Sequence, residues 1–259
     1  MPTVEVPGAE LAVALSDEGG HPVVQLHGLT SSRARDRVLN LDLGRGLSGT
    51  RLLRYDARGH GRSTGRKVPD DYRWQNLAED LLRVLDRSFP GEPVHGVGPS
   101  MGAATLLHAA SIEPDRFTGL TLMVPPTAWR TREGQAAVYR AAAALIESDG
   151  VEAFLSATRG STPPPATVGA PETWPDVPDA LLPSLLRGAA LSDLPAPSDI
   201  ARIDVPTTIL AWVDDPGHPL STAEELAALL PRATVTVART PGDVEAWPEV
   251  LSRDVDRRE

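Results

Sequence analysis

Short apolar runs alternate with longer amphipathic segments along most of the chain. The apolar runs, whose length is typical of β-strands, are residues 3–6, 10–15, 22–27, 51–55, 94–97, 117–124, 207–213 and 233–238. The longer segments, typical of helices, are residues 72–88, 103–112, 221–230 and 244–256. Leu77, Leu81 and Leu85, for example, recur at the spacing of one helical face. This alternation predicts an α/β fold with a mostly parallel central sheet flanked by helices.

The alternation stops between residues 127 and 198. This stretch holds nine of the 25 prolines, and its pattern predicts helices near 134–148, 151–158 and 179–190 but no strand. Strand–helix alternation resumes at Thr207. We therefore expect one α/β core built from residues 1–126 and 199–259, with residues 127–198 inserted as a helical cap. A length of 259 residues suits one such domain.

Composition excludes several classes of function. The 35 acidic and 25 basic residues leave a net charge of −10, which argues against a nucleic-acid partner. Cysteine is absent, so disulfides, thiol catalysis and cysteine-ligated zinc are ruled out. The first 20 residues do not read as a secretory signal and no run of 18 apolar residues occurs, so we expect a cytoplasmic protein without a membrane partner. The pattern does not indicate an oligomeric state.

The most specific motif is Gly98-Pro99-Ser100-Met101-Gly102, which fits G-x-S-x-G between a predicted strand and a predicted helix. Glycines on both sides of a serine let a strand and a helix approach each other closely. The hydroxyl then projects above the sheet beside the helix N-terminus. The alternative is an ordinary turn serine, because the five-residue pattern also occurs by chance. The strand–turn–helix context favours Ser100 as a nucleophile.

Cofactor and metal motifs are not satisfied. The glycines at 96–102 and 59–65 miss the spacing of dinucleotide and phosphate loops. Asp215 and His218 supply at most two of the ligands that zinc requires. We therefore expect neither a cofactor nor a metal.

Four segments together resemble the α/β-hydrolase fold family. They are the serine motif, Leu26-His27-Gly28-Leu29, the segment from Tyr55 to Ser63, and Asp214-Asp215-Pro216-Gly217-His218-Pro219. They occur in the family's order, and residues 127–198 lie where the family carries its cap. The resemblance covers nearly the whole chain and implies a serine esterase-like branch with a helical cap.

The resemblance also implies roles for individual residues. The backbone N–H groups of Leu29 and Met101 would form the oxyanion hole, and Asp215, with Pro219 four positions later, would be the acid. Its neighbour Asp214 is the alternative acid. His27 and His60 belong to turns that shape the backbone, so we expect both to be structural.

The expected base is missing. In the family, a histidine follows the last strand, but this chain reads Thr240-Pro241-Gly242-Asp243 there, and no histidine lies beyond His218. We hypothesise that acid and base have exchanged loops, with His218 as the base and Asp243 orienting it, while Asp215 supports them or orients His218 instead. The alternative is that Asp243 caps the helix at 244–256 and His218 points to solvent.

The sequence thus predicts a serine hydrolase that acts on a small-molecule ester or related acyl substrate. Two alternatives stay open. One is acyl transfer on the same scaffold, and the other is a catalytically dead relative that binds a small molecule.

Overall fold

A single sheet organises the chain. The computed structural model describes residues 2–159 and 162–256; residues 1, 160–161 and 257–259, which fall within the predicted core and cap, lie outside the described residues. Within that range the sheet has eight strands in the order β1-β2-β4-β3-β5-β6-β7-β8. They are β1 (Thr3–Val6), β2 (Ala9–Asp17), β3 (His21–Gln25), β4 (Thr50–Tyr55), β5 (Val94–Pro99), β6 (Phe117–Met123), β7 (Thr207–Trp212) and β8 (Ala233–Ala238). β2 pairs antiparallel with β1 and β4, and every other pair is parallel, so the predicted fold class is confirmed.

Every predicted helical segment contains a helix, whereas the short helices at Arg33–Val38 and Pro197–Ile200 lie outside those segments. The α-helices are α1 (Arg33–Val38), α2 (Trp74–Ser88), α3 (Met101–Ile112), α4 (Arg132–Asp149), α5 (Val151–Thr158), α6 (Leu182–Ala190), α7 (Pro197–Ile200), α8 (Leu220–Leu229), α9 (Pro241–Glu245) and α10 (Trp247–Asp256). Short 3₁₀ turns lie at Leu43–Gly46, Pro69–Tyr72, Pro114–Arg116, Trp129–Thr131 and Pro165–Thr167. The helix predicted over 244–256 is divided between α9 and α10. Pro248 explains the break, because it has no N–H to bond to the carbonyl of Val244.

Apolar side chains cover both faces of the sheet. Successive strand residues point to opposite faces, so Val23 and Val24 enter different hydrophobic clusters, as do Leu210 and Ile209. One cluster includes residues of α2, α3 and α8, and the other includes residues of α10. Helices on both sides therefore shield a sheet whose central strands are almost entirely buried.

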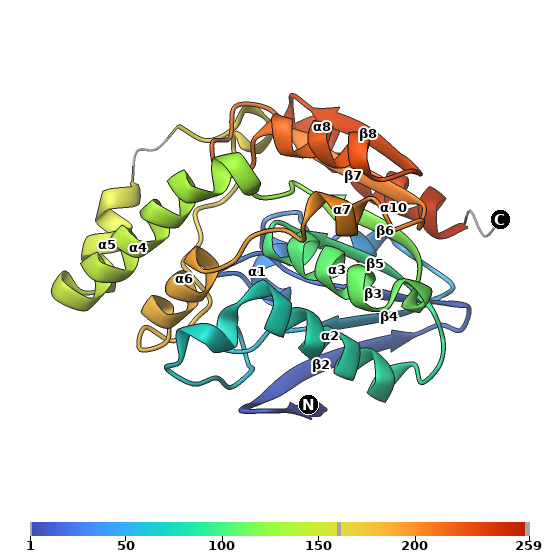
Figure 1. Cartoon of the computed structure of the whole chain (residues 1–259), viewed down its shortest axis with the longest axis horizontal. Helices are drawn as coiled ribbons and strands as arrows, with labels where there is room; N and C mark the ends of the chain where they lie inside the picture. The colour runs from blue at the N-terminus through green and yellow to red at the C-terminus, as the bar shows by residue number, and fades with distance from the viewer. Residues whose placement is uncertain (1, 160–161, 257–259) are drawn as a thin grey trace.

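Helices dominate residues 127–198, which hold α4, α5, α6 and the first residues of α7. Residues 127–159 and 162–198 contain no strand. In Figure 1, α4, α5 and α6 lie together at the left, to one side of the sheet. Their own hydrophobic cluster joins Ala143 and Ile146 of α4 to Leu185 of α6 and includes Tyr72 from the core. The segment is thus packed onto the core by buried apolar contacts.

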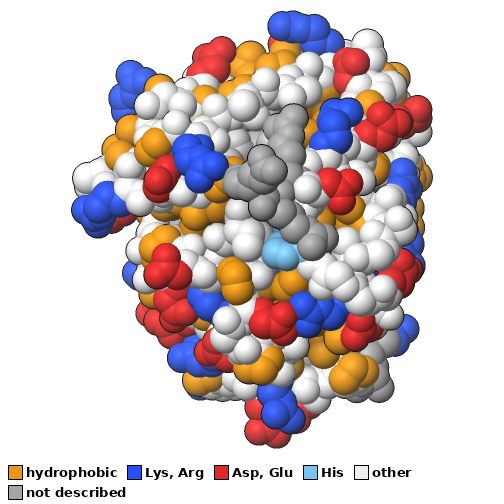
Figure 2. Space-filling model, turned by 90° about the vertical axis from the view of Figure 1, so that its right-hand side faces the viewer, with side chains coloured by type: hydrophobic (Ala, Val, Ile, Leu, Met, Phe, Trp, Pro, Cys, Tyr) orange, Lys and Arg blue, Asp and Glu red, His pale blue; other side chains and the backbone are white. Residues whose placement is uncertain are grey.

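The surface mixes both signs of charge. Figure 2 shows the end of the molecule away from α4 and α5, where acidic and basic side chains alternate with hydrophobic ones. Among the described residues, no helix combines the length and apolarity needed to cross a bilayer.

The close approach of α3 to β3 depends on glycine. A Cβ on Gly102 would lie 2.9 Å from the Cβ of Leu26 and 3.1 Å from the carbonyl oxygen of His27, whereas a Cβ on Gly134 of α4 would meet nothing within 4 Å. We expect Gly102→Ala to lower the free energy of unfolding by about 1–3 kcal/mol through overpacking. Gly134→Ala, the control, should raise it by up to about 1 kcal/mol because alanine favours the helix. Chemical denaturation of both variants checks this, and equal stabilities would contradict the packing argument.

Candidate active site

Ser100 lies at the turn between β5 and α3. Its backbone has φ 51° and ψ −110°, a conformation that side-chain-bearing residues rarely adopt. The turn is held by a bond from the Ser100 amide to the carbonyl of Met123 at 2.9 Å. A Cβ on Gly98 would lie 2.9 Å from the Cβ of Leu26, so this glycine, like Gly102, allows the close contact. Ser100 is half-buried at the end of a central strand. A strained backbone of this kind persists only where the surrounding structure enforces it.

The loop after β7 folds as a tight turn. Asp215, Pro216, Gly217 and His218 follow the typical order of a β-turn with proline second. The His218 amide donates to the carbonyl of Asp215 at 3.2 Å, and the Gly217 amide donates to Asp215 Oδ1 at 2.9 Å. This turn brings the side chains at its first and last positions to the same side.

His218 bridges Ser100 and Asp215. Its Nε2 lies 2.8 Å from Ser100 Oγ, and its Nδ1 lies 2.8 Å from Asp215 Oδ2. The side chain of His218 is 25% exposed and that of Asp215 is 15% exposed, so the chain of bonds is partly shielded from water. A proton on Nδ1 leaves Nε2 free to accept the Ser100 hydroxyl proton. The structure therefore joins these three residues in one hydrogen-bonded relay.

Trp212 supports the relay, a feature that the sequence analysis did not identify. Its indole Nε1 donates to Asp215 Oδ2 at 2.8 Å, and its ring meets the His218 ring edge-on. Burial opposes ionisation of Asp215, but the bonds from His218, Trp212 and the Gly217 amide outweigh it and lower the pKa to about 2. Trp212 also stacks on Trp247 of α10, which fixes the indole in place.

Asp243 lies outside this relay, which corrects the hypothesis that it orients His218. Its Oδ2 accepts from the backbone amides of Arg239 and Thr240 at 2.8 and 2.9 Å. Thr240 is the N-cap of α9, and its side chain accepts from the Asp243 amide in return. These bonds hold the Asp243 carboxylate at the start of α9, and the Nδ1 of His218 is bonded to Asp215 instead. Of the two carboxylates, Asp215 alone is in contact with the imidazole.

The loop after β3 passes close to Ser100. A Cβ on Gly28 would lie 3.9 Å from the Cβ of Ser100, and Leu29 follows directly. His27 fixes this loop: its Nδ1 lies 2.8 Å from the carbonyl of Gly28, and its Nε2 accepts from the Ala57 amide at 2.9 Å. Burial lowers the pKa of His27, so the ring is neutral and both bonds can form. His27 has the hydrogen-bonding position expected of a structural residue.

Ser100 and His218 open into a cavity of about 370 Å³. Its floor comes from the loops after β3, β5 and β7, and α4, α5 and α6 contribute its walls through Val138, Phe154 and Leu186. Most of the lining is aliphatic or aromatic, so an apolar small molecule fits its chemistry. Among residues 2–159 and 162–256, no group of three His, Asp or Glu side chains is arranged to hold a metal ion.

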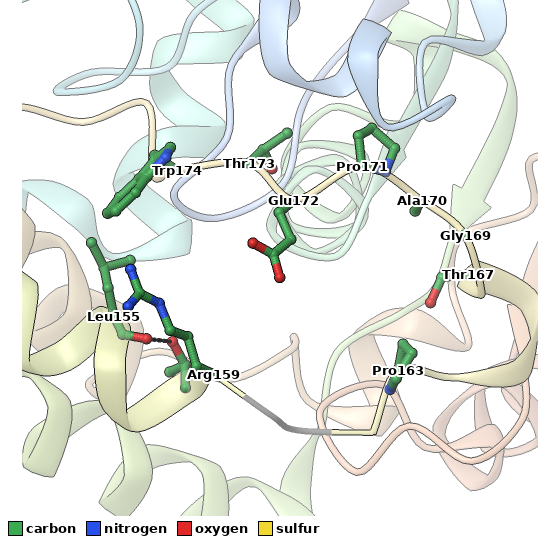
Figure 3. Close-up of a pocket in the computed structure, with 11 residues that line it drawn as sticks. Leu155, Arg159, Pro163, Thr167, Gly169, Ala170, Pro171, Glu172, Thr173 and Trp174 are labelled. Atoms are coloured by element: carbon green, nitrogen blue, oxygen red, sulfur yellow. Dashed lines mark hydrogen bonds between the residues drawn. The ribbon is translucent and has the colours of Figure 1, made fainter.

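A second hollow lies beside the first. It occupies about 490 Å³ between α5 and the chain from Pro163 to Trp174, and Figure 3 shows the Glu172 side chain extending into it. Thr158 lines both hollows. Arg35, which lines the inner cavity, donates to the side chain of Thr173 at 2.8 Å. This outer hollow is more polar than the cavity beside Ser100.

Comparison with known proteins identifies the fold. Residues 21–143 match the family model of the alpha/beta hydrolase fold. A putative carbamate hydrolase, RutD, of Pseudomonas syringae is 28% identical over 200 residues, which cover 74% of this chain and 75% of that protein. The crystal structure of the enol-lactonase from Burkholderia xenovorans LB400 aligns with a TM-score of 0.78 at 21% identity, covering 99% of this chain and all of that one. The chain therefore has the α/β-hydrolase fold.

A second solved structure is about as similar to this chain as the enol-lactonase is. The structure of a hydrolase from Pseudomonas aeruginosa aligns with a TM-score of 0.77 at 25% identity over 98% of this chain and 96% of that one. In the present α/β-hydrolase chain, Ser100 follows β5 and Asp215 follows β7, as the resemblance implied. Its imidazole, however, comes from the β7 loop instead of the loop after the last strand.

We expect the bonds to Asp215 to stabilise the folded protein. A carboxyl whose folded pKa is about 2, below its ordinary 3.8, stabilises the fold above pH 4, and that contribution is lost as the pH falls towards 2. We expect Asp215→Asn to lower the free energy of unfolding by about 1–2 kcal/mol at pH 7, after allowance for partial solvent screening. The difference from wild type should shrink at pH 3. Urea denaturation at both pH values measures it, with exposed Asp214→Asn as the control; a gap that is the same at both values would contradict this account.

Proposed function

We propose that this protein is a serine hydrolase that cleaves an ester or related acyl bond, with Ser100 as nucleophile. The observation that carries the proposal is the pair of 2.8 Å bonds that link Ser100 to His218 and His218 to Asp215. Relatives named as hydrolases in the comparisons support the same reaction class. A base on the serine and a carboxylate on the base are the arrangement that nucleophilic acyl transfer requires.

The reaction follows from these positions. Ser100 Oγ attacks the acyl carbon while His218 Nε2 takes the hydroxyl proton, which forms a tetrahedral intermediate. Its collapse breaks the bond to the leaving alcohol, and His218 returns the proton to that oxygen. Water then attacks the acyl-serine, gives its proton to His218, and releases the acid as the serine regains its hydrogen. Asp215 holds the imidazole in the tautomer that accepts at Nε2 and stabilises the imidazolium between steps.

The negative charge on the intermediate needs donors close to Ser100. We assign this role to the backbone amides of Leu29 and Met101. Met101 is the first residue of α3, so its N–H has no partner within the helix, and Leu29 follows the glycine that approaches Ser100. One such donor contributes about 3 kcal/mol to lowering a barrier of this kind. Residues 127–198 act as a cap in this proposal, because three of their helices line the cavity above the serine.

A bonded Ser–His–Asp relay argues against a catalytically dead binding protein. Such a protein has no use for an imidazole placed within 2.8 Å of a strained serine. His218 and Asp215 keep part of their surface exposed, so water can approach the acyl-serine as hydrolysis requires.

Substitution of the relay tests the proposal. We expect Ser100→Ala and His218→Ala each to lower kcat/KM for p-nitrophenyl butyrate by at least about 10³-fold, and the double variant to lose little more, because the two act as a unit. Initial rates at pH 7.5 measure this.

Asp243→Asn is the matched control for the loop that normally carries the base. Asp243 bonds to the backbone and side chain at the start of α9. Its loss should leave kcat/KM within about threefold of wild type. Full activity in His218→Ala, or inactivation by Asp243→Asn alone, would refute the proposed roles.

A further inference from the structure

One carboxyl group in the cavity has no role in the relay. Asp36 lies in α1, is 2% exposed, and lines the same cavity as Ser100 and His218. Its Oδ1 accepts a bond from the Ser31 hydroxyl. No hydrogen bond of ordinary geometry from the described part of the chain reaches its Oδ2. Within residues 2–159 and 162–256, no other buried side-chain atom without a partner belongs to a residue that lines this cavity.

The other polar side chains of the cavity wall are engaged. The guanidinium of Arg35 bonds to Thr173 and to the carbonyl of Thr30, and the hydroxyl of Thr158 bonds to the carbonyl of Leu155. A buried carboxyl oxygen left without a partner costs free energy, and an apolar residue would avoid that cost. An unfilled position of this kind inside a substrate cavity indicates a partner that arrives with the ligand.

We propose that Asp36 determines specificity by bonding a hydroxyl group of the substrate, so that the preferred substrate is a hydroxylated ester. This inference rests on the proposed function and names a substrate class for the same site. The rest of the cavity is mainly aliphatic and aromatic, so one polar contact at Oδ2 suffices to separate a hydroxylated ester from an alkyl ester of equal size.

The chemistry of the group favours a hydroxyl. Burial raises the pKa of Asp36 to about 7, against the opposing effects of the Ser31 bond, the nearby Arg35 and the backbone N–H of Gly28, with Asp42 adding to the rise. Both the acid and the carboxylate are therefore populated near neutral pH. A hydroxyl can accept a hydrogen bond from the acid or donate one to the carboxylate, so it suits both forms. An ether oxygen can only accept and suits the acid alone.

Matched pairs of substrates test the proposal. One pair is p-nitrophenyl 3-hydroxybutyrate and p-nitrophenyl butyrate, and the second is glycerol monobutyrate and propyl butyrate, so that a hydroxyl on either side of the ester is sampled. We expect wild type to favour the hydroxylated member of at least one pair by about 10-fold or more in kcat/KM, mainly through KM. In Asp36→Leu that ratio should fall to about one.

Two further measurements separate recognition from structure. Asp36→Asn keeps the shape and both donor and acceptor capacity, so it should retain part of the preference. The 3-methoxybutyrate ester should be favoured by wild type at pH 6 and lose that advantage at pH 8, while Asp36→Asn should show no such change. A role in folding alone would alter both members of a pair equally.

A binding measurement tests this inference separately from the proposed function. The Ser100→Ala protein, in which no turnover occurs, is titrated calorimetrically with matched esters. The pairs are ethyl 3-hydroxybutanoate with ethyl butanoate, or glycerol monobutyrate with propyl butyrate. Tighter binding of the hydroxylated ester, abolished by adding Asp36→Leu, supports the inference even if wild type hydrolyses nothing. Hydrolysis of the esters without any hydroxyl preference in wild type, or a preference that survives in Asp36→Leu, overturns it and leaves the serine-hydrolase proposal intact.

Discussion

The hydrogen bond between His218 and Asp215 is the contact on which the proposed chemistry depends. Both residues lie in one turn after β7, and the backbone bond between them fixes the distance that the side chains must span. A base and its carboxylate on one short loop need no precise alignment of two loops from different strands. Only the approach to Ser100, which comes from β5, requires the sheet to be correctly assembled.

Two residues with strained backbone and one aromatic stack lie close to this contact. Ser100 follows β5 and Asp214 follows β7, at the same edge of the sheet, and both have positive φ, at 51° and 59°. The stack of Trp212 on Trp247 links the relay to α10. The buried strands and helices around these residues stabilise their strained conformations, because strained residues persist only where packing enforces them.

Much of this arrangement could be predicted from the sequence. Hydrophobic runs separated by amphipathic segments predicted all eight described strands, and the motif around Ser100 predicted its turn, because glycine spacing directly limits local geometry. The pairing of His218 with Ser100 was a hypothesis, since residues 118 positions apart meet only through tertiary structure. Asp243 was misjudged because a carboxylate after the last strand can either orient a base or cap a helix, and Thr240 three residues earlier is the sign of the second. The unpartnered oxygen of Asp36 has no sequence signal at all, because it depends on what every neighbour bonds to.

The central claim is that His218 activates Ser100. Covalent labelling by a fluorophosphonate at pH 7.5 tests it most directly, because it reports serine nucleophilicity without requiring the natural substrate. We expect labelling of Ser100 in wild type, located by peptide mass spectrometry, and a rate at least about 100-fold lower in His218→Asn, whose melting temperature should show that it is folded. Equal labelling rates in the two proteins, or a label on another residue, would contradict it.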